Sequence, residues 1–345
     1  MVHATQTDSP SSSVTVDISL RLGIDLAKNV FELVQVKDRS TVVFNKRLNR
    51  EQLTALVMKL PPQRIVMEAC ATSTWWAQKF TAMQHEVLLI APQHVRAYRQ
   101  GQKNDRNDAH AIIEASFNPK FNPVPIRSPY QQELAALNNH RDRIKGERTR
   151  LANQMRACLA EFGIVVPKSV HKLRAAVPTL IESAVPQALK VLLQTQYEAL
   201  CRQDVALKEA TLMITTHLAN DARSEQLMAQ RGIGPQIAAG VLAHCCPQAY
   251  QNGRGYAAVV GITPGQDSSG ETRRLLPITK SGSRRVRTLL IHGGRSVVRI
   301  AERHPEDPLC VWAKQIADRR GKNVAAVAVA NKLARYAWAI LAHAA

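Results

Sequence analysis

Acidic residues, aromatic residues and paired cysteines are all scarce in this sequence. Its 345 residues include 27 aspartates and glutamates against 46 lysines and arginines, and only 5% are aromatic. The 6 cysteines form no CxxC pair, so a zinc ribbon is not expected, and scattered thiols suit a reducing cytoplasm. No phosphate-binding P-loop occurs either, so nothing in the sequence points to nucleotide hydrolysis as an energy source.

Long apolar runs and targeting segments are also missing. No uninterrupted apolar span of about 18 residues occurs. The run from Val324 to Leu341 is broken by Lys332 and Arg335, which predicts an amphipathic helix. Residues 1–17 are rich in Ser and Thr and lack the basic start and apolar centre of a signal peptide, so we expect a disordered tail there. We therefore expect a cytoplasmic protein that does not enter a membrane.

Positive charge is what the sequence has in excess. The formal net charge is +19, and 45% of the residues are hydrophobic, which is enough for real cores. A charge of this size predicts a polyanionic partner, with nucleic acid as the default. The alternative is a merely soluble basic surface. The length suits two or three domains.

Four carboxylates lie at the ends of predicted elements in the first third of the chain. Asp25 and Glu68 each end an apolar run, and Asp105 and Asp108 lie at the head of a predicted helix, on one face. Two carboxylates about 4 Å apart repel by roughly 4 kcal/mol at an effective dielectric near 20, and a bound cation removes that cost. The pattern therefore predicts a Mg²⁺ site, with Mn²⁺ as a substitute. Taken singly, each acid has a plain alternative as a turn residue, helix cap or surface residue.

The order of predicted elements around these acids indicates a mixed α/β sheet with helices packed on it. Strands are predicted at 20–25, 30–36, 41–44, 65–68 and 87–90, and helices at 52–60, 74–84 and 93–100. This order, with acids at these places, resembles the RNase H-like fold of Holliday-junction resolvases.

Two long helices are predicted after a proline-rich linker at 118–129. Apolar residues recur in steps of three and four over 131–163, and Leu193, Leu200, Leu207 and Ile214 are a heptad apart. This spacing favours coiled-coil arms over ordinary core helices, with residues 164–185 as their connection. Arg141 and Arg148 occupy the apolar stripe of the first arm, which favours an arm that meets a partner chain or nucleic acid.

The last third carries a glycine turn, two serines and a basic cluster. Residues 227–238 predict helix, tight turn and helix, like a helix-hairpin-helix, in which Gly232 and Gly234 would let the backbone approach a phosphate. Ser268 and Ser269 lie in a predicted flexible glycine-bounded loop, where a serine is either a nucleophile or part of a plain turn. Six basic residues beside them are candidate nucleic-acid contacts: Arg273, Arg274, Lys280, Arg284, Arg285 and Arg287.

Together these stretches resemble the DEDD transposases of the insertion-sequence 110 family, more closely its 1111 subgroup. The matching segments cover nearly the whole chain after residue 17, and their order is more specific than any one of them. They are 23–28, 67–70, 103–109, 231–234, 261–270, 280–282 and 287–293.

The resemblance implies a site-specific DNA recombinase that excises and inserts an insertion sequence. It implies a RuvC-like DEDD domain at 18–128, coiled-coil arms at 129–220 and a mainly α transposase domain at 221–345. It further implies that Asp25, Glu68, Asp105 and Asp108 hold Mg²⁺, and that a serine links covalently to DNA. Ser269, immediately before the glycine, matches that serine best, and the adjacent Ser268 stays open.

The resemblance also implies partners and a location. Family members work with a structured noncoding guide RNA on DNA and assemble as dimers or tetramers, in the bacterial cytoplasm at the nucleoid. Two other functions remain open: a metal-dependent junction nuclease in which the serine is idle, and a nucleic-acid-binding protein without catalysis.

Overall fold

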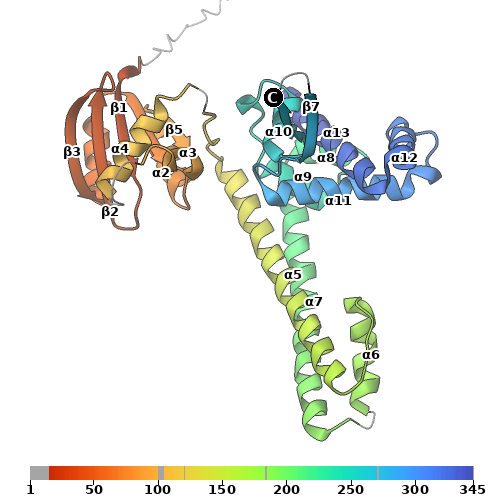
Figure 1. Cartoon of the computed structure of the whole chain (residues 1–345). Coiled ribbons are helices and arrows are strands. Elements are labelled where there is room, and N and C mark those ends of the chain that lie inside the picture. Colours follow the sequence, from red (N-terminus) through yellow and green to blue (C-terminus); the bar gives the residue numbers. More distant parts are fainter. Residues whose placement is uncertain (1–14, 100–104, 120, 183–184, 270–271, 345) are drawn as a thin grey trace, which may run out of the picture. The chain divides into compact units, whose positions relative to one another are not determined.

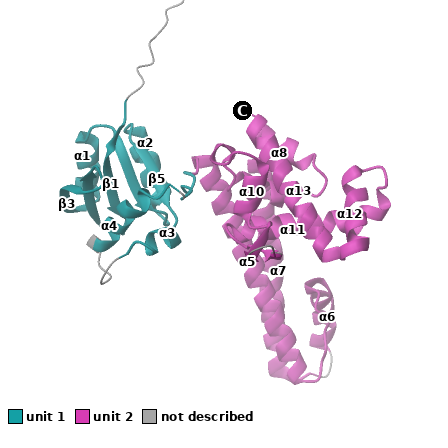
Figure 2. Ribbon diagram, turned by 45° about the horizontal axis from the view of Figure 1, so that its top comes forward, with its two compact units in different colours: residues 1–126 teal, residues 127–345 magenta. Residues whose placement is uncertain are grey.

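The computed structural model of the chain describes residues 15–99, 105–119, 121–182, 185–269 and 272–344, without the side chains of residues 105, 106 and 273. The chain divides into two compact units, residues 1–126 and 127–345 (Figure 1, Figure 2). Residues 1–14 of the tail expected at 1–17 lie outside the described residues. The first strand already begins at Asp17, the last residue of that expected tail.

The first unit is built on a five-stranded mixed sheet with the strand order β3-β2-β1-β4-β5. Strands β1, β2 and β3 are antiparallel neighbours, whereas β4 is parallel to both β1 and β5. The strands are β1 Asp17–Asp25, β2 Val30–Lys37, β3 Thr41–Asn49, β4 Gln63–Glu68 and β5 Glu86–Ile90. All five predicted strands are confirmed, although β3 continues well past its predicted end at residue 44.

Helices cover both faces of this sheet. They are α1 Arg50–Lys59, α2 Ser73–Ala82, α3 Pro92–Arg96 and α4 Asp105–Ser116. Because side chains alternate along a strand, Leu22 and Ile24 pack with α1 and α2, while the intervening Gly23 faces α4. A Cβ at Gly23 would lie 2.5 Å from Ile113 Cγ1 and 3.0 Å from the Ala109 carbonyl oxygen. Helix α4 therefore lies directly on β1, two residues before the end of that strand.

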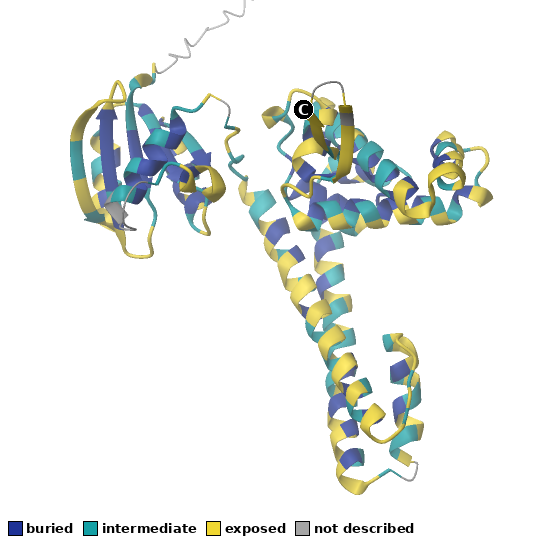
Figure 3. Ribbon diagram, viewed as in Figure 1, coloured by how far each residue is buried: buried dark blue, intermediate teal, exposed yellow. Residues whose placement is uncertain are grey.

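The second unit begins with two long helices that lie side by side. They are α5 Pro129–Glu161 and α7 Gln187–Leu218, and Figure 3 shows buried and exposed residues alternating along both. The segment predicted as a plain connection holds a third helix, α6 Val170–Glu182, with Pro178 inside it. Leu173 and Val177 of α6 are fully buried against α5 and α7. This burial offsets the roughly 3 kcal/mol that a proline costs inside a helix.

The two arginines in the predicted seam find their partners within the helix pair. Arg148 forms an ion pair with Asp204 of α7, and Arg174 of α6 reaches the same carboxylate at 2.8 Å. Arg141 donates from Nε to Thr211 Oγ1 of α7 at 3.0 Å. The antiparallel neighbour thus explains both arginines, and neither needs a partner chain or nucleic acid.

The rest of the second unit is a helical body with one small hairpin. Its helices are α8 Ala222–Met228, α9 Pro235–Leu242, α10 Gly253–Val260, α11 Arg284–Ile300, α12 Pro308–Arg320 and α13 Lys322–His343. Two short 3₁₀ turns, η1 Pro247–Ala249 and η2 Ala301–Arg303, join them, and the hairpin consists of β6 Pro264–Ser269 and β7 Thr272–Ile278. By length and hydropathy, α13 is the one helix among the described residues that could cross a membrane. Here its buried residues form the centre of the body's core with α11 and α12.

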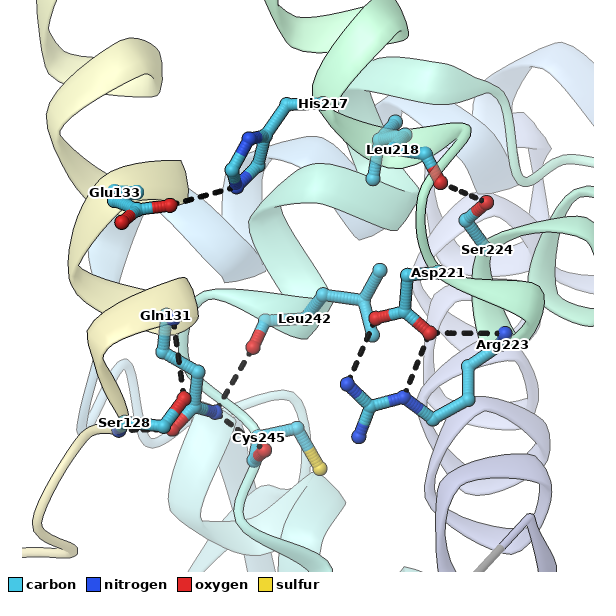
Figure 4. Close-up of polar contacts among 10 residues, drawn as sticks. All are labelled: Ser128, Gln131, Glu133, His217, Leu218, Asp221, Arg223, Ser224, Leu242 and Cys245. Carbon is cyan, nitrogen blue, oxygen red and sulfur yellow. Dashed lines mark hydrogen bonds and ion pairs between the residues drawn. The ribbon is translucent and has the colours of Figure 1, made fainter.

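The head of α5 is bonded to the body (Figure 4). Ser128 caps the helix by accepting from the Gln131 N–H at 3.2 Å, and Gln131 Oε1 accepts from the Ser128 N–H at 3.1 Å. The Gln131 side chain then donates from Nε2 to the carbonyl oxygens of Leu242 and Cys245 at 2.9 and 3.1 Å. The N-terminal end of α5 is therefore bonded to the C-terminal end of α9 and to the segment that follows it.

Two glycines in helices should respond oppositely to alanine. In α11, a Cβ at Gly294 would lie 2.1 Å from the Ala326 carbonyl oxygen of α13. We expect Gly294→Ala to lower the free energy of unfolding by about 1–3 kcal/mol through overpacking. In α5, Gly146 has open space around its Cβ position, so Gly146→Ala should raise stability by roughly 0.5–1 kcal/mol. Urea denaturation of both variants tests this, and a stable Gly294→Ala protein would contradict the close α11–α13 crossing.

Candidate functional site

Two of the predicted acids end neighbouring parallel strands. Ile24 of β1 pairs with Met67 of β4, so Asp25 and Glu68 follow each other at the same edge of the sheet. Adjacent strands lie about 4.8 Å apart, which brings the two carboxylates to one place. Carboxyl ends of parallel strands are where α/β sheets most often carry their sites.

Asp108 is brought to this edge by helix α4. The helix packs on Gly23 through Ala109, the residue after Asp108. Asp108 is only 8% exposed, and its Oδ1 lies 2.5 Å from Arg99 Nε. The contact lacks hydrogen-bond geometry, since both atoms are buried without a hydrogen-bond partner among the described residues. No sequence pattern indicated that Arg99 would lie beside Asp108, because their contact depends on the tertiary structure.

Glu68 lies within electrostatic reach of Asp108. Its pKa is raised above the ordinary value because burial disfavours the charged form, and Asp108 adds to the increase. Arg99 and Arg96 act in the opposite direction without cancelling the effect. A glutamate that resists ionisation beside a second carboxylate is typical of an acid cluster that functions with a counter-cation.

The described acids fit a hard divalent cation only in part. Carboxylate oxygens are the donors that Mg²⁺ prefers, and Asp108 Oδ1 is a buried oxygen with no hydrogen bond. Among the residues whose side chains are described, however, no three of the His, Cys, Asp and Glu type are grouped closely enough to hold a metal. The side chain of Asp105 lies outside the described residues, so the predicted tetrad stays a prediction.

The raised pKa of Glu68 has a measurable consequence for stability. A carboxyl whose pKa is raised by folding contributes stability below its ordinary pKa and loses it as pH rises through the raised value. Glu68→Gln cannot ionise, so at pH about 8, without divalent cations, we expect this variant to melt at a higher temperature than the wild-type chain. Added Mg²⁺ should raise the melting temperature of the wild-type chain but not that of Glu68→Gln. Glu51→Gln, an exposed site on α1, is the control and should behave like wild type. A lower melting temperature for Glu68→Gln would contradict the proposed burial of charge.

The two candidate serines lie on a strand, so the prediction of a flexible loop is wrong for both. Ser268 and Ser269 are exposed residues at the end of β6, paired with Arg273 and Thr272 of β7. The prediction failed because glycine and serine favour loops locally, whereas pairing with β7 is a tertiary effect. Gly270, which bounds the motif, lies outside the described residues.

The hydroxyl groups of the two serines differ. Ser268 Oγ accepts from Gln266 Nε2 at 2.9 Å and from the Arg274 N–H at 3.3 Å. For the Ser269 hydroxyl, the described part of the chain offers no hydrogen bond. Ser268 is therefore occupied in holding the hairpin, whereas Ser269 presents an exposed oxygen.

The base of the hairpin is held by close backbone contacts. Gly282, at φ 64°, lies so near α10 that a Cβ would be 2.0 Å from the Val259 carbonyl oxygen. The Arg287 side chain donates from one terminal nitrogen to the carbonyl oxygens of Val260 and Ser281, at 3.0 and 2.7 Å. Arg287 of α11, predicted as a nucleic-acid contact, thus joins α11 to α10 and to the segment that follows β7.

The other predicted basic contacts have different surroundings. Arg285 forms an ion pair at 2.6 Å with Asp142 of α5. Arg274, Lys280 and Arg284 are exposed. The side chain of Arg273 lies outside the described residues. The structure therefore brings the basic residues near the serines but leaves only some of them at the surface.

The predicted glycine turn lies between α8 and α9. Gly232, at φ 92°, packs against α11, where a Cβ would meet Val297 Cγ2 at 2.7 Å. Gly234 caps α9 with open space beside it and no side-chain hydrogen bond to the first amides. Packing thus accounts for Gly232, whereas Gly234 stays available to a ligand.

Comparison with known proteins assigns both halves of the chain to transposases. A DEDD-type IS110 transposase profile matches residues 22–164, and one described as "Transposase IS116/IS110/IS902 family" matches residues 224–307. A "Probable family 20 transposase" of Pseudomonas aeruginosa is 37% identical over 329 residues, covering 93% of this chain and 96% of the relative. The "Transposase for insertion sequence element IS1111A" of Coxiella burnetii is 33% identical, covering 93% and 89%. That for element IS1328 of Yersinia enterocolitica is 35% identical, covering 92% and 96%.

Proposed function

Because the chain belongs to the IS116/IS110/IS902 transposase family, we propose that it excises and inserts an insertion sequence through a covalent phosphoserine link at Ser269. Membership of this family makes the chain a DNA-cleaving and rejoining enzyme. The chemistry, the metal and any guide RNA are parts of the proposal.

One observation carries the proposal. Asp25 and Glu68 end adjacent parallel strands, and Asp108 of α4 lies within electrostatic reach of Glu68. These three acids fall within the segment that the first transposase profile matches, and Ser269 falls within the second. The two candidate centres thus lie in the two segments that transposase profiles match.

The proposed reaction assigns a separate task to each group. The carboxylates of Asp25, Glu68, Asp105 and Asp108 would hold Mg²⁺, or Mn²⁺ in its place, and bound metal would stabilise negative charge on the scissile phosphate. Ser269 Oγ attacks the phosphorus, and the bond from phosphorus to the leaving sugar oxygen breaks. The serine proton passes to solvent, and the leaving oxygen takes up a proton. Attack by another strand's hydroxyl then breaks the Ser269–phosphorus bond, so the bond energy is kept without nucleotide hydrolysis.

The domain organisation belongs to the same proposal. We infer that residues 18–128 form an RNase H-like, RuvC-like domain, since the sheet order and the acid positions fit it. Residues 129–220 would serve as coiled-coil arms for dimers or tetramers, and residues 221–345 as the transposase domain with a helix-hairpin-helix-like turn. The charge of +19 favours a polyanionic partner. The family resemblance adds a structured guide RNA to DNA, in a nucleoid-associated complex of the bacterial cytoplasm.

A plasmid carrying the element's two ends and the adjoining noncoding region tests the proposal. Incubated with the chain and Mg²⁺, it should yield excised circles, and a denaturing gel should show protein bound covalently to DNA. Cleavage without the covalent product would instead favour the junction-nuclease function. Removing the noncoding region should stop excision if RNA guides it.

A further inference from the structure

One face of α11 carries an exposed basic stripe that extends well beyond the basic residues predicted from the sequence. Its members are exposed residues of this helix: Arg284, Thr288, His292, Arg295 and Arg299. At about 100° per residue, these positions fall within an arc of about 80°. Val286, Leu290 and Val297 lie on the opposite side and are buried in the body's core. The stripe is therefore one continuous surface over the whole helix.

The arginines of the basic stripe are not paired within the described part of the chain. No ion pair to Arg284, Arg295 or Arg299 occurs among the described residues, and the first turn of α11 has no acid. Glu302 and Asp318 line a pocket beside Arg295 and Arg299 without forming an ion pair with either. Arg284 lies in the first turn of α11, where the helix dipole favours negative groups by about 0.3–1 kcal/mol each, so a bound anion would stabilise this end. Arg299 lies in the last turn, where the dipole favours its positive charge.

A groove of about 760 Å³ adjoins the stripe along His292. The glycine turn at 232–234, the start of α9 and Arg141 and Lys145 of α5 complete its lining. Arg231 in the groove is already paired with Asp307, whereas Lys145 is exposed and Gly234 leaves the first amides of α9 without a side-chain cap. Pro235 has no N–H, and the N–H groups of Ile237 and Ala238 donate to the Gly234 carbonyl oxygen. The groove therefore offers a phosphate mainly the exposed Lys145.

We propose that the basic stripe and this groove form one surface that binds the phosphodiester backbone of a nucleic-acid duplex, with Arg295 and Arg299 as phosphate contacts. The helix that carries the stripe has 17 residues, or about 25 Å, enough for several phosphates at about 3.4 Å per strand. The proposal rests on the proposed function only in that both require nucleic-acid binding. It differs from the sequence prediction in placing the contacts along α11, because Arg285 and Arg287 have partners inside the unit.

Measuring DNA affinity at several salt concentrations tests whether Arg295 and Arg299 contact phosphates. The full chain is titrated into a labelled random-sequence DNA duplex of about 30 base pairs, with EDTA present so that no cleavage intervenes. For Arg295→Ala with Arg299→Ala, we expect affinity to fall about tenfold or more, and the slope of log K against log salt to shrink by about 1.8. The corresponding lysine pair keeps both charges and should retain most of the slope. An RNA duplex of equal length, run in parallel, shows which nucleic acid the surface prefers.

The matched control removes two arginines elsewhere in the same unit. Arg319 and Arg320 are exposed at the end of α12, so Arg319→Ala with Arg320→Ala changes the net charge equally. If the stripe pair and the control pair lose the same slope, only general charge matters and this inference is wrong. If the wild-type chain binds neither duplex, the proposed function itself fails. Far-UV circular dichroism and thermal melting verify that every variant is folded.

Discussion

Replacing Ser269 by alanine is expected to abolish the covalent protein–DNA product and to lower strand exchange by at least about a thousandfold, as for other covalent nucleophiles. Ser269 is exposed at the end of β6 and pairs in register with Thr272. Removal of one surface oxygen there breaks no hydrogen bond of the described fold. DNA binding and the melting temperature should therefore stay at wild-type levels, and the loss should be confined to chemistry.

Ser268→Ala is the matched control for this prediction. The Ser268 hydroxyl accepts from Gln266 Nε2 and from the Arg274 N–H, so its loss should loosen the hairpin and reduce the rate by less than about tenfold, in keeping with one neutral hydrogen bond of roughly 1 kcal/mol. Denaturing gels with labelled DNA distinguish the two variants. A covalent product from Ser269→Ala, or its loss from Ser268→Ala alone, would assign the nucleophile to the neighbouring residue.

Asp25→Asn is expected to have the second-largest effect. The change keeps the shape of the side chain but removes a charge beside Glu68 at the edge of the sheet. Loss of one preorganised electrostatic group in an active site costs about 10²–10³ in rate, so strand cleavage should fall at least that far. The stabilisation that Mg²⁺ or Mn²⁺ gives against thermal unfolding should fall with it, which provides a measurement independent of activity.

Glu86→Gln is the control for Asp25. Glu86 lies at the start of β5, at the other end of the parallel strands from Asp25, and its carboxylate pairs with Arg64 at 2.9 Å. The variant removes the same charge from the same sheet but from the end away from the acid cluster. It should leave both cleavage and metal stabilisation close to wild type. Equal losses in the two variants would indicate that total charge, and not a cation site, governs the effect.

Local patterns predicted much of the first unit. Strands β1 and β4 each contain a short apolar run that ends in an acid, and the positions of Asp25 and Glu68 follow from those runs. Their adjacency also follows, because parallel strands align their ends. The contribution of Asp108 depends on how α4 lies on Gly23, and the presence of Arg99 beside it depends on the path of the chain after β5. Neither can be read from residue spacing.

The misses in the second unit have a common cause. Pro178 and the serines around residue 268 each favour a break or a loop locally, yet burial of Leu173 and Val177 forms α6 and pairing with β7 forms β6. The seam arginines were assigned to an outside partner because Asp204 and Thr211 lie far along the chain. In each case a contact distant in sequence decided the outcome.

The length of α5 and α7 sets how far the tip of the pair would move if its base tilted. Helix α5 has 33 residues and is fixed at its head by the Gln131 bonds, so it reaches about 50 Å from that fulcrum. A tilt of about 10° at the fulcrum would sweep the tip that carries α6 through roughly 9 Å, nearly the diameter of a helix. A small tilt beside α9 would thereby give a large displacement at the far end.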